Sequence, residues 1–269
     1  MTHVMLPDGI LPWWISVGGA VVAILIVGAC TVGMQAEASA KAVASTAVMT
    51  ALMIVVMSID LVPIGYELHG TVLAGIVVGP RMASVSALGF NVVRALVGDG
   101  AVTNLGVNTV LTWLEMAGGF VAFRLLARGQ IARRVALAGG LATVASLASV
   151  TIIYVAVMLA AGEAAYHAAF AELGEMVDEA GRLPNLGAGT FAAITLISGA
   201  IGWTIEGLAT GVLLAFIARA RPGLVRALRG DGPLAGRAEL DPARGGLFDH
   251  PVADGSDRRT TSTSPDRHP

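Results

Sequence analysis

Long runs of apolar residues, several of them near or above twenty residues, constrain the fold of this chain more than any other feature. About twenty apolar residues in an α-helix cross the hydrocarbon core of a lipid bilayer. Only 13% of the residues are charged, whereas soluble domains have about one quarter. The sequence therefore predicts an all-α membrane protein that crosses the lipid bilayer of the cell (cytoplasmic) membrane several times.

Seven apolar segments can be delimited, and they predict a bundle of about seven transmembrane helices. The segments are residues 11–32, 42–58, 70–80, 81–97, 107–127, 135–161 and 187–218. The third and fourth meet at Gly79-Pro80, which is compatible with either a turn or a kink. Residues 223–269 lack apolar periodicity, so we expect a disordered cytoplasmic tail behind a transmembrane domain of residues 1–222.

The charges of the connections predict the orientation of the segments. Basic residues favour the cytoplasmic side, and here they alternate with acidic connections. The basic residues of these connections are Lys41, Arg81, Arg124, Arg128, Arg133, Arg134, Arg219, Arg221, Arg226 and Arg229. The alternation predicts an N-terminus outside, a cytoplasmic C-terminus and an odd number of spans. A single span over residues 70–97 would break it.

Composition and motifs exclude several functions. The net charge of −2 gives no indication of a nucleic-acid partner. The only lysine, Lys41, follows Ala38-Ser39-Ala40, so the chain has no Walker A loop for ATP. It also lacks the closely spaced histidine pair of zinc hydrolases. We therefore expect that the chain is not an enzyme.

The charged residues Arg94, Glu115 and Glu206 fall inside apolar segments. Burying a charge in hydrocarbon costs roughly 2.5–3.5 kcal/mol, so such side chains normally face the bundle interior or a partner protein. We expect Arg94 to extend towards the outer interface, Glu115 to pair with an arginine, and Glu206 to contact another subunit.

Two further patterns concern the arrangement of the helices. Small residues at helical spacing in the first and last segments predict close helix contacts, by default within the chain. They are Ser16, Gly19, Ala20, Ala23, Gly199, Gly207 and Gly211. The acidic connection of residues 162–186 is long enough to form an amphipathic outer helix.

The N-terminus, Met1-Thr2-His3, carries groups that chelate metals. A free amine, a peptide nitrogen and an imidazole on consecutive residues suit Ni(II) or Cu(II) and tolerate Co(II); the alternative is a solvated tail histidine. The predicted topology puts His69 on the same outer side as a candidate fourth ligand. Asn104 and Asn108 could hydrogen-bond the N-terminal segment or orient His69, or cap the fifth segment. Asp8 is a turn former or a support of the same site.

Three motifs resemble the cobalt/nickel substrate-binding membrane subunits of energy-coupling-factor transporters, the CbiM/NikM family. The first is the N-terminal histidine followed by Pro7-Asp8-Gly9-Ile10-Leu11. The second runs from Val62 to Pro80 and contains Glu67-Leu68-His69-Gly70, and the third is the stretch from Gly98 to Thr109. The specific part of the resemblance covers roughly residues 1–120, and it also implies a seven-helix bundle with an outside N-terminus.

The resemblance implies a square-planar metal site. Its ligands are the terminal amine, the amide nitrogen and imidazole of a histidine at position two, and a second histidine from the outer loop; His3 and His69 match these roles. Because the family typically begins Met-His, we expect Met1 to be removed here, which makes Thr2 the terminal amine. With Met1 retained, the amine, two amides and His3 could fill the plane, and His69 would be spare.

The resemblance also implies a function and partners. The chain would capture Co(II) or Ni(II) as transported substrate, with no permanently bound cofactor, and a link to cobalamin biosynthesis is implied. The partners would be a transmembrane coupling (T) subunit, cytoplasmic ATPase subunits and, in some systems, a small accessory membrane subunit. Two alternatives stay open: a proton-coupled secondary carrier that uses Glu115 and Glu206, and a vitamin-type substrate-binding subunit in which His3 would be dispensable.

Overall fold

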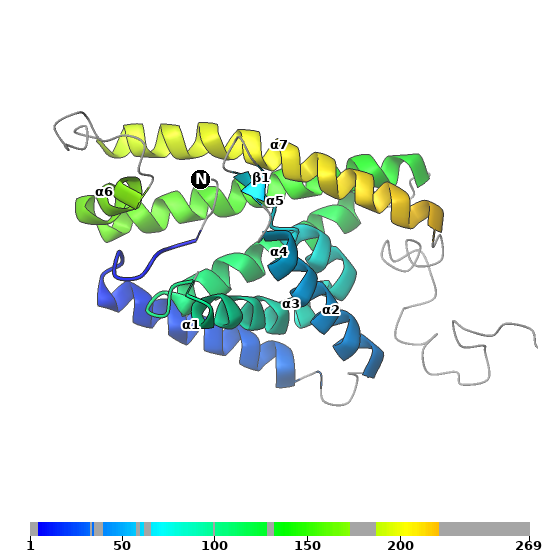
Figure 1. Ribbon diagram of the computed structural model, residues 1–269, viewed down its shortest axis with the longest axis horizontal. Coiled ribbons are helices and arrows are strands. Elements are labelled where there is room, and N and C mark those ends of the chain that lie inside the picture. Colours follow the sequence, from blue (N-terminus) through cyan, green and yellow to red (C-terminus); the bar gives the residue numbers. More distant parts are fainter. Residues whose placement is uncertain are drawn as a thin grey trace, which may run out of the picture. The chain divides into compact units, whose positions relative to one another are not determined.

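The computed structural model describes residues 5–32, 34, 40–57, 60–61, 66–98, 100–127, 132–172 and 187–220. Seven helices lie within these ranges (Figure 1): α1 (Trp13–Val32), α2 (Ala40–Met57), α3 (Thr71–Leu96), α4 (Leu105–Ala127), α5 (Ala132–Ala161), α6 (Glu163–Glu172) and α7 (Ala188–Ala220). The strands β1 (Asp60–Leu61) and β2 (Tyr66–Glu67) form a two-residue antiparallel pair. The prediction of an all-helical fold is thus confirmed for the described residues, apart from this short pair.

The lengths of the helices agree with a membrane protein. Five helices are long and apolar enough to cross a bilayer, namely α1, α3, α4, α5 and α7, and residues 42–57 of α2 form a shorter apolar helix. Apolar helices form because lipid offers no partner for backbone N–H and C=O groups, which must be satisfied within the helix. The count of seven spans and the orientation of the termini stay predictions.

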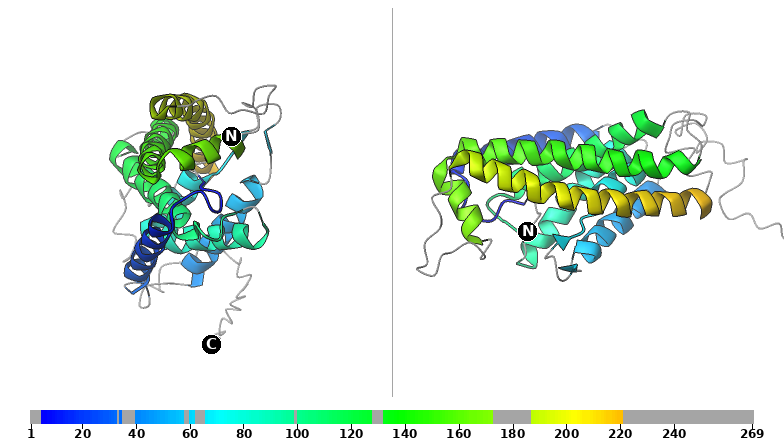
Figure 2. Two further views of the ribbon diagram at one scale, coloured as in Figure 1. Left: turned by 90° about the vertical axis from the view of Figure 1, so that its left-hand side faces the viewer. Right: turned by 90° about the horizontal axis from the view of Figure 1, so that it is seen from above.

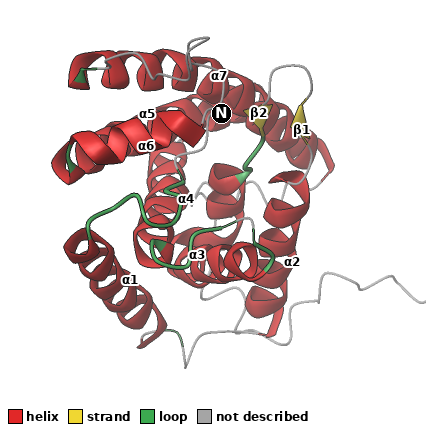
Figure 3. Ribbon diagram, turned by 60° about the vertical axis from the view of Figure 1, so that its left-hand side comes forward, coloured by secondary structure: helices red, strands yellow, loops and turns green. Residues whose placement is uncertain are grey.

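The bundle is organised around α3 and α4. Helix α4 packs against α1, α3 and α5, while α3 also packs against α2. Figure 3 shows α3 and α4 between α1, α2 and the pair formed by α5 and α7. Helices α5 (green) and α7 (yellow) lie side by side along their lengths in the right-hand view of Figure 2. Residues of α3 and α4 therefore occupy the middle of the described bundle.

Small residues allow the close helix contacts that the sequence predicts. A Cβ atom at Gly106 of α4 would lie 2.3 Å from Cα of Ala20 in α1. On the other side of the bundle, a Cβ atom at Gly207 of α7 would lie 2.9 Å from the carbonyl oxygen of Gly140 in α5. The prediction that the first and last segments use small residues for contacts within the chain is confirmed at Ala20 and Gly207.

Helix α3 is broken near the end of its first third. Gly79 has φ 79° and ψ 164°, a region that residues with a Cβ avoid. Pro80 follows, and the indole N–H of Trp113 in α4 donates to its carbonyl oxygen at 3.0 Å. Before the break, residues 71–78 extend about 12 Å at 1.5 Å per residue, short of the roughly 30 Å that a bilayer crossing needs.

Two predictions concern the segments after α5. Helix α6 occupies the first part of the connection for which we predicted an outer helix, and the rest of that connection, residues 173–186, lies outside the described residues. The predicted tail, residues 223–269, also lies outside them. The division into a transmembrane domain and a disordered tail therefore stays a prediction.

Candidate metal centre

The N-terminal segment is held against the start of α4 by two asparagines. The side chain of Asn108 accepts a hydrogen bond from the Leu6 N–H at 2.9 Å and donates to the Leu6 carbonyl oxygen at 3.0 Å. Asn104 donates to the carbonyl oxygen of Pro7 and accepts from the Ser16 hydroxyl at 2.7 Å. Both asparagines thus bind the backbone of the N-terminal segment, one of the roles that the sequence left open for them.

Asp8 adds a second attachment of the same segment. Its carboxylate accepts hydrogen bonds from the backbone N–H and the hydroxyl of Thr103, both at 2.6 Å, and from the N–H of Val102 at 3.1 Å. Chiefly the hydrogen bond from the Thr103 side chain lowers the pKa of Asp8 below its ordinary value. Gly9 completes the turn with φ 75° and donates its N–H to the Thr103 hydroxyl at 3.2 Å.

Thr2 and His3, the two ligands predicted at the chain start, lie outside the described residues. Their roles as ligands stay a prediction.

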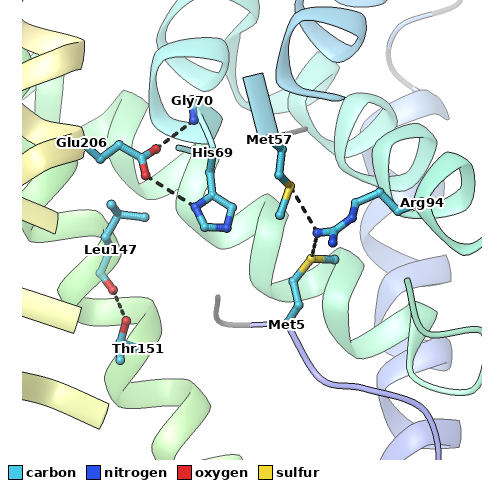
Figure 4. A network of polar contacts seen from close by, with 8 residues as sticks. All are labelled: Met5, Met57, His69, Gly70, Arg94, Leu147, Thr151 and Glu206. Atoms are coloured by element: carbon cyan, nitrogen blue, oxygen red, sulfur yellow. Dashed lines mark hydrogen bonds and ion pairs between the residues drawn. The ribbon is translucent and has the colours of Figure 1, made fainter. Parts of the chain in front are cut away.

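His69, the predicted ligand from the distant loop, is buried at the start of α3. Its Nδ1 lies 3.5 Å from Oε2 of Glu206 in α7, and the other carboxylate oxygen accepts the N–H of Gly70 at 2.9 Å. Figure 4 shows one carboxylate joining the imidazole and the adjacent backbone. Glu206 is 1% exposed, so our prediction that it contacts another subunit was wrong. Its partners are His69 and Gly70 of the same chain.

The electrostatic surroundings of His69 are mixed. Burial lowers the pKa of His69, but the hydrogen bond and the charge of Glu206, together with the charge of Glu115, outweigh burial and raise it above 6.5. Arg94 acts in the opposite direction. The net effect favours a proton on an imidazole that a metal ion would have to displace.

Arg94 does not extend to the interface, contrary to our prediction. The residue is 7% exposed, and its Nη1 donates to the sulfur atoms of Met5 and Met57, the latter at 3.1 Å. The guanidinium also lies 5.8 Å from the centre of the Phe90 ring. Figure 4 shows the ring of His69 between Glu206 and this methionine–arginine group. The described part of the N-terminal segment therefore begins at Met5, close to His69.

Glu115 is the second buried carboxylate of the centre. Its charge acts on His69, and the arginine partner that we predicted for it stays a prediction. Glu115 belongs to α4, whereas Glu206 belongs to α7. Helices α4 and α7 thus each supply one carboxylate around the loop that carries His69.

The donor set of the described residues is incomplete for a metal ion. Within the ranges that the structure covers, no group of three His, Cys, Asp or Glu side chains can hold one. His69 would need ligands of another kind or from another part of the chain. Sequence reasoning did not connect Glu206 or Met57 with His69; the available signal was only a charge inside an apolar run.

A family model described as the cobalt uptake substrate-specific transmembrane region, CbiM, matches residues 5–224. Two crystal structures have a similar fold. One, of a truncated transition metal transporter, gives a TM-score of 0.57 with 17% identity and covers 80% of this chain and 96% of that chain. Another, of a transition metal transporter, gives a TM-score of 0.60 with 16% identity, covering 84% and 97%. No curated protein sequence matches the chain.

Proposed function

This chain belongs to the CbiM family of cobalt uptake substrate-specific transmembrane regions, and from that premise we propose that it captures Co(II) or Ni(II) for an energy-coupling-factor ABC transporter. Family and fold together make it a metal uptake protein of the membrane. The proposal adds the mechanism of capture, the metals and the partner subunits, with cobalamin biosynthesis as one use of the imported metal.

One observation carries the proposal. The N-terminal segment is fixed at Leu6 by Asn108, and Met5 then contacts the arginine whose charge acts on buried His69. A chain start held in this way can bring its nitrogen donors to an imidazole from a loop more than sixty residues away in the sequence. Nitrogen donors suit late first-row divalent metals better than Mg²⁺ or Ca²⁺, which prefer oxygen.

The proposed ligands form a flat set of four nitrogens. Removal of Met1 leaves Thr2 to supply the terminal amine, His3 its amide nitrogen and imidazole, and His69 a second imidazole. Asp8, Asn104 and Asn108 hold the segment that follows these N-terminal donors. Metal binding displaces protons from these donors, so affinity falls as pH falls.

Energy for release into the cell comes from other subunits in this proposal. The sequence has no Walker A loop, so ATPase subunits and a transmembrane coupling (T) subunit, with a small accessory membrane subunit in some systems, complete the transporter. Metal uptake that persists without ATPase subunits but stops in Glu115→Gln would favour the proton-coupled carrier instead.

The test is to block the N-terminus of the full chain. Three purified proteins are loaded with Co(II) or Ni(II), and their metal content is measured. They are the wild type, a variant with one residue inserted between Met1 and Thr2, and a control with one residue added after Pro269. We expect loss of bound metal only in the N-terminally extended variant. Intact mass shows whether Met1 is removed. Equal loading of all three proteins would contradict the proposal.

A further inference from the structure

Glu206 is a carboxylate in the middle of a long apolar helix. It lies on α7 and is 1% exposed. Insertion of such a residue in hydrocarbon is costly, and its retention is typical of residues with a function inside the bundle. Its two carboxylate oxygens are therefore expected to have defined partners inside the bundle.

Each oxygen of Glu206 holds a different part of the loop before α3. Oε1 accepts the backbone N–H of Gly70 at 2.9 Å, and Oε2 lies 3.5 Å from Nδ1 of His69. Gly70 has φ 64°, a conformation that glycine adopts without strain. The carboxylate thus fixes the backbone and the imidazole of two consecutive residues together.

The contact of Nδ1 with Glu206 determines which ring nitrogen of His69 can bind a metal. An imidazole that binds a metal through one nitrogen commonly donates its other N–H to a carboxylate, which selects the tautomer, orients the ring and makes the ligand more basic. With Nδ1 facing Glu206, Nε2 faces away from α7. Figure 4 shows the ring of His69 extending from Glu206 towards Met5 of the N-terminal segment.

We infer that Glu206 is a positioning residue of the metal centre, which orients His69 through Nδ1 so that Nε2 binds the metal brought to it by the N-terminal segment. This inference rests on the proposed function. Glu206 itself does not touch the metal. Its loss weakens metal binding and changes the state of the distal nitrogen of His69, without removing a ligand.

A second glutamate–histidine pair of this chain provides a matched control. On α6, Oε1 of Glu163 lies 3.6 Å from Nε2 of His167, nearly the separation found for Glu206 and His69. The side chain of Glu163 is 72% exposed, however. Glu163→Gln therefore makes the same chemical change at a surface pair outside the proposed centre.

The experiment compares full-length wild-type protein with Glu206→Gln, Glu206→Asp, Glu163→Gln and His69→Ala. Gln retains an oxygen for the Gly70 N–H but removes the charge, and Asp retains the charge on a shorter side chain. Ni(II) affinity is measured first. We expect a 10- to 100-fold loss in Glu206→Gln, the range found when partners of ligating histidines are changed. Glu206→Asp should lose less, and Glu163→Gln should bind like wild type.

Pulsed electron paramagnetic resonance of the Cu(II)-loaded proteins supplies a readout that a loss of packing would not produce. The distal nitrogen of a coordinated imidazole modulates the signal, and its coupling depends on its hydrogen bond. The part of the modulation that His69→Ala removes belongs to His69. We expect this part to change in Glu206→Gln, to be retained in Glu206→Asp and to be unaffected in Glu163→Gln.

The outcomes separate this inference from the proposed function. Wild-type affinity and unchanged His69 modulation in Glu206→Gln would overturn the positioning role while leaving the site itself intact. Wild-type affinity in His69→Ala would instead remove His69 from the metal site and contradict the proposed ligand set. If Glu206→Gln does not fold, Glu206→Asp decides: we expect a smaller loss of Ni(II) affinity with the His69 modulation retained, whereas a changed His69 modulation combined with wild-type affinity would show that the contact at Nδ1 does not set the affinity and would overturn the inference.

Discussion

Asn108 hydrogen-bonds both backbone groups of Leu6, a residue 102 positions earlier in the chain. Its Oδ1 accepts the Leu6 N–H at 2.9 Å, and its Nδ2 donates to the Leu6 carbonyl oxygen at 3.0 Å. Leu6 is 1% exposed, so water does not replace these hydrogen bonds. The pairing holds the described part of the N-terminal segment against α4.

Replacement of Asn108 by leucine should weaken metal binding. The change leaves two buried backbone groups of Leu6 unsatisfied, at roughly 1–3 kcal/mol each. Because about 1.4 kcal/mol corresponds to tenfold in affinity, we expect Ni(II) affinity measured by titration to fall at least tenfold. Thr109→Val is the control, since the Thr109 hydroxyl donates only to Leu105 of its own helix at 2.7 Å. Equal affinity of the two variants would contradict a role of the Asn108–Leu6 hydrogen bonds in metal binding.

His69→Ala should reduce Co(II) and Ni(II) affinity by more than a hundredfold, because it removes one of four proposed nitrogen ligands. The matched control is His167→Ala on α6, which removes a histidine paired with a surface glutamate. Isothermal titration of the purified proteins measures both effects. Retained binding in His69→Ala together with a retained Met1 would favour the alternative in which the chain start fills the plane alone.

Metal affinity should fall as the pH is lowered, and the fall should begin at a higher pH than for a site whose imidazole has an ordinary pKa. Glu206 raises the pKa of His69 above 6.5, so a proton competes with the metal at and above that pH. The sign is opposite for the metal-free protein: the stability contributed by protonated His69 beside Glu206 is present below pH 6.5 and is lost as pH rises through the raised pKa. Metal titrations and thermal unfolding across pH 6.5 measure the two trends, and a rise in affinity at low pH would contradict them.

Gly75→Ala should destabilise the bundle beside the candidate site. A Cβ atom there would lie 2.2 Å from the carbonyl oxygen of Met116 in α4, and backbone atoms cannot move aside as a side chain can. Overpacking of this kind typically costs about 1–3 kcal/mol. Gly18→Ala on α1, where the new atom meets nothing within 4 Å, is the control. Thermal unfolding in detergent should distinguish them, and equal midpoints would contradict the observed approach of α3 to α4.

Much of the fold could be predicted because each apolar segment needs only local information to become a helix. The predicted segments 107–127 and 135–161 differ from α4 and α5 by at most three residues at either end. Gly79-Pro80 was recognised as a break from the proline alone. His69, Asn104 and Asn108 were selected by motif and by predicted side of the membrane. The structure places the two asparagines against the N-terminal segment, whereas the role of His69 as a ligand stays a prediction.

The sequence by itself therefore determined which segments are helical and which polar residues are candidates for a functional role. Only the tertiary structure decided that Glu206 faces His69, 137 positions away by residue number, and that Arg94 meets the sulfur atoms of Met5 and Met57. The physical reason is that a membrane helix is apolar both towards lipid and towards its neighbours. Its sequence then carries little periodicity to define its rotation, and close packing of small residues and buried polar contacts defines it instead.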